Sequence, residues 1–218
     1  MKRASLKNVY AKLFSHFGPQ HWWPGDTRFE VIVGAILTQN TAWANVEKAI
    51  VNLKKAGALK SPAVMKRLTT GKLAGLIRPA GYYNIKAKRL RNFLDFLGRR
   101  YSLSLIELSR AETGRLRREL LEVNGIGPET CDSILLYAFG RPLFVVDAYT
   151  KRIFSRHGLF EKEAGYADVQ KVFMDNLRRK IGLFNEYHAL IVRLGKELCR
   201  KEPRCGACPL KGLKITCK

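Results

Sequence analysis

Acidic residues are scarce in this chain. Its 218 residues include 18 Asp and Glu against 40 Lys and Arg, which gives a formal net charge of +22. Because 46% of the residues are hydrophobic and 10% aromatic, the charge belongs to a folded protein and a disordered basic tail is excluded. Lys and Arg that neutralise phosphates release counterions, so nucleic acid is the expected partner, with an acidic membrane surface as the alternative.

Long apolar runs are also missing. No stretch approaches the roughly 18 to 20 residues that a bilayer span requires, and the basic residues at positions 1–8 have no apolar segment behind them. We therefore expect no membrane-spanning helix, no signal peptide, and a cytoplasmic, nucleoid-associated protein. Repeats and linker-like tracts are absent too, so composition marks no domain boundary.

What the chain does contain is helical periodicity. Residues 29–37 are apolar nearly all round and predict a buried helix, whereas residues 143–146 form a short strand-like run that ends at Asp147, a residue type suited to cap the next helix. Two segments carry apolar residues at the spacing of one helix face: Leu90, Phe93, Leu94 and Leu97, and later Tyr166, Val169, Phe173 and Leu177.

The cysteines are concentrated at one end. Four of the five, Cys199, Cys205, Cys208 and Cys217, lie in the last 20 residues with the spacing C-x5-C-x2-C-x8-C. In a cytoplasmic protein, thiols this close together indicate metal ligands rather than disulfides. Zinc and a [4Fe-4S] cluster both accept four thiolates, and the single C-x2-C pair favours the cluster, with zinc as the alternative. Cys131 stands apart and is expected to be a small buried side chain.

A glycine-rich turn lies near the middle of the chain. Residues 121–130 place Gly125, Ile126 and Gly127 between two helical segments, and Pro128 can open the second helix at its first turn. Such a helix-hairpin-helix presents backbone N–H groups to a phosphate. Taken alone, the motif is equally consistent with a simple turn between helices.

With these features in combination, the chain resembles the endonuclease III branch of the helix-hairpin-helix (HhH-GPD) DNA glycosylase superfamily. In pattern the chain is most similar to its 3-methyladenine glycosylases. The resemblance extends from about Trp22 to Cys217. Besides the cysteines it is carried by residues 37–41, 78–88, 125–130 and 145–147.

The resemblance implies an all-α fold of two lobes with the active site in the cleft between them. Residues 22–135 would form the central helical bundle with the hairpin at 121–130. Residues 1–21 and 136–218 would form the second lobe, whose loop 199–217 carries the [4Fe-4S] cluster. The expected partner is double-stranded DNA with damaged bases, bound by a monomer.

The catalytic aspartate of the family matches Asp147. Cleavage of an N-glycosidic bond builds positive charge on the sugar, which a carboxylate stabilises while it orients a water. The alternative is that Asp147 only caps the following helix. Bifunctional members carry a lysine where this chain has Glu129. A carboxylate forms no Schiff base, so we expect a monofunctional enzyme that leaves the strand intact. Lys151 is expected to pair with an acid or to contact a phosphate.

The three tryptophans indicate the substrate. An extruded base stacks in a pocket, and aromatic walls suit an alkylated, positively charged purine such as 3-methyladenine through a cation–π interaction. The alternative is that the tryptophans at 22 and 23 plug the docking surface of the N-terminal segment. The pocket is assigned to Trp22, Trp23, Pro24, Trp43 and Glu129.

The remaining DNA contacts follow from the resemblance and from charge. A glutamine that matches Gln39 fills the gap left by the extruded nucleotide in the family. Lys86 begins a basic run and is a candidate phosphate contact. The full set is Gln39, Asn40, Gly125, Ile126, Gly127 and Lys86. Two other functions stay open: a glycosylase for uracil, mismatched thymine, hypoxanthine or oxidised pyrimidines, with or without lyase activity, and a non-catalytic protein that binds damaged DNA.

Overall fold

The computed structural model describes residues 2–217. They form two compact units. One contains the described residues up to Trp23 together with those from Pro142 onward, and the other is Pro24–Arg141. The sequence-based division placed these boundaries at residues 22 and 136. Within the described residues, no helix is both long and apolar enough to cross a membrane.

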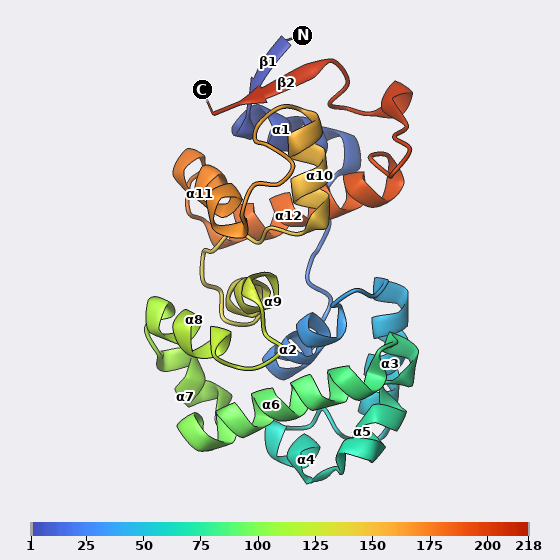
Figure 1. Cartoon of the computed structure of the whole chain (residues 1–218), viewed down its shortest axis with the longest axis vertical. Coiled ribbons are helices and arrows are strands. Elements are labelled where there is room, and N and C mark those ends of the chain that lie inside the picture. Colours follow the sequence, from blue (N-terminus) through green and yellow to red (C-terminus); the bar gives the residue numbers. More distant parts are fainter. Residues whose placement is uncertain (1, 218) are drawn as a thin grey trace. The chain divides into compact units, whose positions relative to one another are not determined.

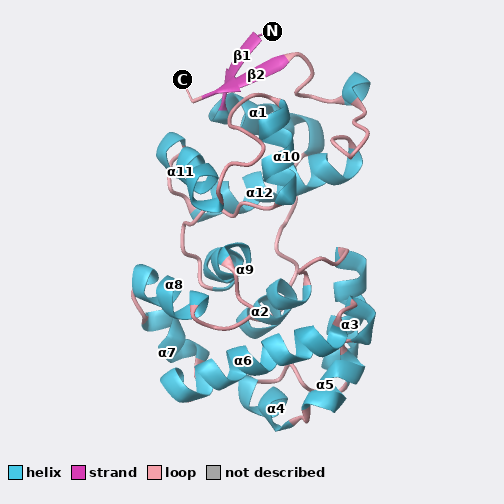
Figure 2. Cartoon of the chain, in the orientation of Figure 1, coloured by secondary structure: helices cyan, strands magenta, loops and turns pink. Residues whose placement is uncertain are grey.

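The Pro24–Arg141 unit is helical and is built around one apolar helix, α2 (Figure 2). This helix confirms the buried helix expected at 29–37, and it contacts α3, α6, α9 and η2. Its elements are α2 (Arg28–Leu37), α3 (Trp43–Lys55), α4 (Pro62–Arg67), α5 (Thr70–Leu76), the 3-10 helix η1 (Arg78–Ala80), α6 (Tyr83–Tyr101), α7 (Leu105–Arg110), α8 (Thr113–Leu121), α9 (Pro128–Ser133) and the π-helix η2 (Ile134–Ala138).

The long helix α6 supports most of this unit. Leu90, Phe93, Leu94 and Leu97 are at most 1% exposed, which confirms the predicted apolar face. Helices α2, α4, α5 and α7 all contact α6. The apolar face of α6 packs in the core, and its polar side chains are left to bond to loops of the unit.

The unit that contains both termini has an aromatic core. Phe144 stacks on Phe173 with ring centroids 4.1 Å apart, and Tyr187 contacts both rings edge-on while its hydroxyl donates to Leu6 O at 2.9 Å. Residues 143–146 form no strand. The elements of this unit are β1 (Lys2–Ser5), α1 (Leu6–Phe17), α10 (Ala148–Arg156), α11 (Tyr166–Asn176), α12 (Ile181–Glu197), η3 (Cys205–Ala207) and β2 (Leu213–Thr216).

A small sheet corrects the all-α expectation. Strands β1 and β2, from opposite ends of the chain, pair in parallel with Ala4 opposite Ile215 (Figure 1). Both of these side chains are buried, whereas Arg3 and Lys214 beside them are exposed. Period-two burial over four residues is too short a signal to identify a strand from sequence, and a parallel pair between distant segments depends on the tertiary fold.

Candidate functional site

Asp147 begins helix α10 and caps it. Its backbone is extended (φ −107°, ψ −178°), and Oδ1 accepts hydrogen bonds from Thr150 N at 2.7 Å and from Thr150 Oγ1 at 2.8 Å. The residue is 9% exposed. The capping role expected from the sequence is confirmed, and the cap fixes the carboxylate in one orientation because Oδ1 is held by two donors.

The second carboxylate oxygen faces a histidine. His188 of α12 places Nε2 3.6 Å from Asp147 Oδ2, and both side chains are buried. Burial raises the pKa of Asp147, but the hydrogen bonding and charge of His188, with the two bonds from Thr150, outweigh it and bring the pKa below its ordinary 3.8. Asp147 is therefore an ionised carboxylate at neutral pH, able to stabilise a neighbouring positive charge.

Sequence reasoning missed His188. It lies on α12, whose sequence carries no motif that links it to residue 147. A buried histidine next to a buried carboxylate is visible only once the fold brings α10 and α12 into contact.

The glycine-rich turn joins α8 to α9 as predicted. Gly125 adopts φ +97°, a conformation that favours glycine, and Pro128 is the first residue of α9. Ile126 is buried, and its N–H donates to Val123 O at 2.9 Å. Helix α9 continues directly into η2, so residues 128–138 form one helical run.

Gln39 is tied to this hairpin. Its Nε2 donates to Gly125 O at 2.9 Å and to Thr130 Oγ1 at 2.8 Å, and its Oε1 accepts a hydrogen bond from Arg89. The next residue, Asn40, is exposed and adopts φ +52° in the turn between α2 and α3. The side chain expected to enter the DNA is thus held inside its own unit, whereas its neighbour is free of these bonds.

Lys86 is not the phosphate contact that the sequence predicted. The residue is 1% exposed, and Nζ donates to Leu37 O at 2.8 Å, Ala80 O at 2.8 Å and Thr41 Oγ1 at 2.5 Å. Burial, together with the charge of Arg89, lowers its pKa to about 8. Its ammonium group is used within the protein, so it is unavailable to DNA.

The predicted base-pocket residues are divided between the two units. Trp22 and Trp23 are half-buried and contact each other edge-on with centroids 5.1 Å apart. Pro24 and Glu129 are exposed, and Trp43 begins α3 with its indole N–H donating to Glu47 Oε1 at 2.6 Å. Their meeting in one pocket stays a prediction.

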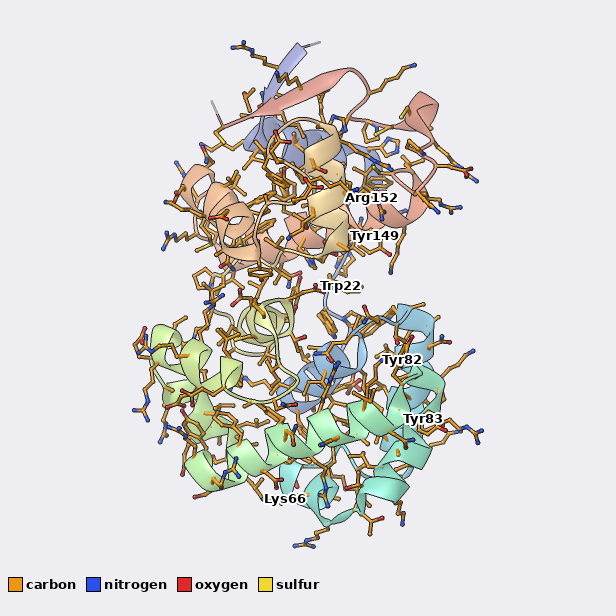
Figure 3. The ribbon with its side chains drawn as sticks, viewed as in Figure 1. Trp22, Lys66, Tyr82, Tyr83, Tyr149 and Arg152 are labelled. Carbon is orange, nitrogen blue, oxygen red and sulfur yellow. The ribbon has the colours of Figure 1, made fainter. Side chains whose placement is uncertain are left out.

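An exposed aromatic tip precedes α6. Tyr82 is 68% exposed at φ +46°, Ile85 is 54% exposed, and Arg78 lies 5.9 Å from the centroid of the Tyr83 ring (Figure 3). Sequence analysis used the Gly-Tyr-Tyr stretch only for the resemblance. The signal that was overlooked is an aromatic pair between a glycine and a basic helix.

The four clustered cysteines do not converge on one point. Among residues 2–217, no three His, Cys, Asp or Glu side chains are arranged to hold a metal ion. Burial raises the pKa of the Cys208 thiol, as does the charge of Cys199 and Cys205, against an opposing bond from Leu210 N–H. Cys217 directly follows β2, which runs away from the loop that carries η3 (Figure 1). The Cys199 and Cys205 thiols thus act electrostatically on Cys208, whereas Cys217 follows the paired strand β2. Cys131 is fully buried, as expected, and burial is the largest cause that raises its pKa to about 12.

Two arginines connect the helix of Asp147 to the cysteine segment. Arg152 lies 5.0 Å above the Tyr149 ring and donates to Gly195 O and Cys199 O, both at 2.9 Å (Figure 3). Arg156 donates to Cys199 Sγ at 3.4 Å and to Arg200 O at 2.7 Å. The start of the cysteine segment is thereby fixed to α10.

Comparisons with known proteins agree with this architecture. Residues 33–179 match the family model described as HhH-GPD superfamily base excision DNA repair protein. The chain is 49% identical over 208 residues to a candidate DNA repair glycosylase of Methanocaldococcus jannaschii, with 94% of each sequence covered. It is 29% identical to endonuclease III of Sulfolobus acidocaldarius over 86% of this chain and 82% of that protein. Among solved structures, the 3-methyladenine DNA glycosylase of H. pylori bound to 1,N6-ethenoadenine superposes with a TM-score of 0.73 at 29% identity, over 87% of this chain and 96% of that one.

Proposed function

Because the chain belongs to the HhH-GPD superfamily and is a DNA glycosylase of its endonuclease III-like branch, we propose that it removes alkylated purines such as 3-methyladenine from DNA by hydrolysis. The observation that carries the proposal is the buried Asp147 carboxylate at the start of α10, held by Thr150 and facing His188. The similarity to a 3-methyladenine glycosylase supports the choice of substrate.

Asp147 supplies the chemistry. As the glycosidic bond breaks, positive charge develops on the sugar, and a carboxylate that is already ionised and oriented stabilises it without reorganisation. Thr150 holds Oδ1 and His188 faces Oδ2. An alkylated purine is a good leaving group, so this stabilisation needs little help from a general acid.

The reaction ends at the abasic site. Glu129 is in the first turn of α9 and is exposed, and its carboxylate cannot form a Schiff base. The nearest candidate amine in sequence to Asp147 is Lys151, which donates to Ala164 O at 2.7 Å instead of pairing with an acid. We therefore infer a monofunctional enzyme whose product strand stays uncut.

Recognition of the base is assigned to aromatic side chains. Trp22, Trp23 and Trp43, with Pro24 and Glu129, would surround the extruded base, and the indole faces would attract an alkylated purine by a cation–π interaction worth about 0.5–2 kcal/mol. A neutral base gains no such attraction. This difference would favour a charged purine over an oxidised pyrimidine.

The protein would bind the duplex through its positive charge, the hairpin backbone and exposed side chains at two turns. The hairpin would bind a phosphate through the backbone N–H groups of Gly125 and Gly127, since that of Ile126 donates to Val123 O. The net charge of +22 would provide sequence-independent affinity. Asn40 and Tyr82 are the exposed side chains of two turns in the Pro24–Arg141 unit. We assign base stacking to Tyr82, because exposed aromatic side chains stack on unpaired bases.

The cysteine segment is proposed to hold a [4Fe-4S] cluster. The donor chemistry fits, since four thiols occur within 20 residues, but within residues 2–217 they are not arranged to hold a metal ion. When bound, the cluster would supply a rigid, cross-linked loop. No step of base release depends on it.

One experiment tests the function. The protein is incubated with duplexes that carry 3-methyladenine, ethenoadenine, hypoxanthine, uracil, mismatched thymine or an oxidised pyrimidine, and strand cleavage is assayed with and without alkali. We expect base release from the alkylated purines and cleavage only after alkali. The variant Asp147→Asn, which retains the cap but not the charge, should bind DNA and release no base. Unchanged single-turnover excision by this variant would overturn the assignment.

A second specificity has one observation in its favour. The similarity to endonuclease III of Sulfolobus acidocaldarius supports the alternative of an endonuclease III-like glycosylase for uracil, mismatched thymine, hypoxanthine or oxidised pyrimidines, with or without lyase activity. The same set of duplexes decides between these substrates and the alkylated purines. A protein that bound damaged DNA and released no base from any duplex would instead be the non-catalytic alternative, against which the retained, ionised Asp147 argues.

A further inference from the structure

The hairpin turn is held by one polar face of α6. Lys86, Arg89 and Asn92 occur at three-residue spacing on this helix. Asn92 Nδ2 donates to Asn124 O at 2.9 Å, and Arg89 donates to Gln39, which in turn donates to Gly125 O. The carbonyl oxygens of two successive turn residues thus accept bonds from side chains that α6 carries or positions.

Arg89 also contacts the turn directly. A Cβ added at Gly125 would lie 2.3 Å from Arg89 Cγ and 2.9 Å from Cδ, so the arginine stem rests against the glycine. Gln39 therefore lies in a network that joins α6, the turn after α2 and the first turn of α9, where it bonds Thr130 Oγ1.

This network sets the direction of the turn's N–H groups. In a trans peptide the C=O and N–H point in opposite directions. Because the carbonyl of Asn124 points at Asn92, the N–H of Gly125 points away from α6. Because the Asn124 carbonyl is held on the side of the turn that faces α6, the Gly125 N–H is presented on the opposite side.

We propose that Gln39, with Arg89 and Asn92, positions the hairpin backbone for phosphate binding, and that Gln39 does not itself enter the DNA. To occupy the place of an extruded nucleotide, its amide would have to break its bonds to Gly125, Thr130 and Arg89. Asn40, exposed in the same turn, makes none of these bonds. The inference rests on the proposed role of the hairpin in binding DNA, and it reassigns the function of Gln39 within it.

The test uses Gln39→Met, which conserves size and removes both the donor and the acceptor, and Asn92→Ala, with Asn45→Ala, an exposed asparagine of α3, as the matched control. Affinity for an undamaged duplex is measured by fluorescence anisotropy over a range of salt concentrations. We expect Gln39→Met and Asn92→Ala each to weaken binding by about tenfold, the equivalent of one lost hydrogen bond to a charged group, and Asn45→Ala to bind as the unaltered protein does.

The salt dependence separates positioning from a loss of charge. Neither substitution removes a cation, so the slope of log affinity against log salt should stay unchanged. Gly125 O belongs to the same peptide group as the Ile126 N–H, which donates to Val123 O. Amide exchange of Ile126 in the free protein should therefore be accelerated in Gln39→Met and not in Asn45→Ala. Circular dichroism checks that each variant folds, and Thr130→Val, which removes the acceptor of a Gln39 bond, replaces any variant that does not.

Two results would overturn the proposal. One is an undamaged-duplex affinity and an exchange rate in Gln39→Met equal to those of the unaltered protein. The other is a loss confined to abasic or lesion-bearing DNA, which would return Gln39 to the extruded-nucleotide site. Both measurements are independent of base release. If the protein released no base from any duplex in the glycosylase assay, the proposed function would be refuted while this inference could still be tested.

Discussion

Lys86 makes the stability of the fold depend on pH in a way that can be calculated. Its pKa is about 8 in the folded protein against 10.5 for a free lysine, chiefly because the group is buried. Below about pH 8 both the folded and the unfolded chain carry the proton. Between about 8 and 10.5 only the unfolded chain does, so the free energy of unfolding rises with pH in this window. The difference between the two pKa values corresponds to roughly 3 kcal/mol.

The variant Lys86→Met removes the titration. At neutral pH two effects oppose each other: the buried charge is lost, which stabilises the fold, and Leu37 O and Ala80 O lose a donor, which costs about 1–3 kcal/mol for each carbonyl. The diagnostic quantity is therefore the pH dependence of the difference between the two proteins. This difference should grow in favour of the unaltered protein by roughly 3 kcal/mol between neutral pH and about pH 10.5.

Urea denaturation followed by circular dichroism measures this difference. The control is Lys88→Met, which removes an exposed lysine two residues away on α6. Its stability should follow that of the unaltered protein in parallel at every pH, because this variant retains the buried Lys86 and the exposed Lys88 side chain is not desolvated by folding. Parallel curves for Lys86→Met would refute the reasoning, since they would mean that Lys86 keeps an ordinary pKa and is not desolvated.

Three further predictions concern the site. His188→Asn removes an interaction that lowers the pKa of Asp147 while burial continues to raise it, so the acidic limb of the single-turnover excision rate should move to higher pH; superimposable profiles would contradict the pairing. Glu129→Lys introduces an amine in the first turn of α9 and should yield a borohydride-trapped adduct absent from the unaltered protein, and failure to trap would separate this position from the reacting sugar. Cys208→Ser and Cys217→Ser should each lose bound iron and brown colour, whereas iron retained only in Cys217→Ser would show that β2 keeps this thiol out of the ligand set.

The sequence predicted the parts of the site whose signals are local. Asp147 caps α10 by accepting from a residue three positions on, and Pro128 opens α9 directly after the glycine turn, so neighbouring residues carry the whole pattern. The wrong assignment of Lys86 and the unforeseen bonds of Gln39 both involve partners far away in the sequence. Lys86 donates to a carbonyl 49 residues away, and Gln39 donates to one 86 residues away. No pattern within a window of the chain distinguishes a lysine that contacts DNA from one that anchors two loops.

The scarcity of acidic residues also bears on how the cations are used. With 18 Asp and Glu for 40 Lys and Arg, the cations outnumber the carboxylates by 22, and several cations use backbone carbonyls as acceptors. Lys86 bonds two carbonyls, and Arg152 and Arg156 bond four between them at the start of the cysteine segment. These groups fasten turns and helix ends whose carbonyls would otherwise lack donors. The net charge therefore overstates the number of phosphates the protein can neutralise, and the salt dependence of DNA binding should report only the cations that are not bonded in this way.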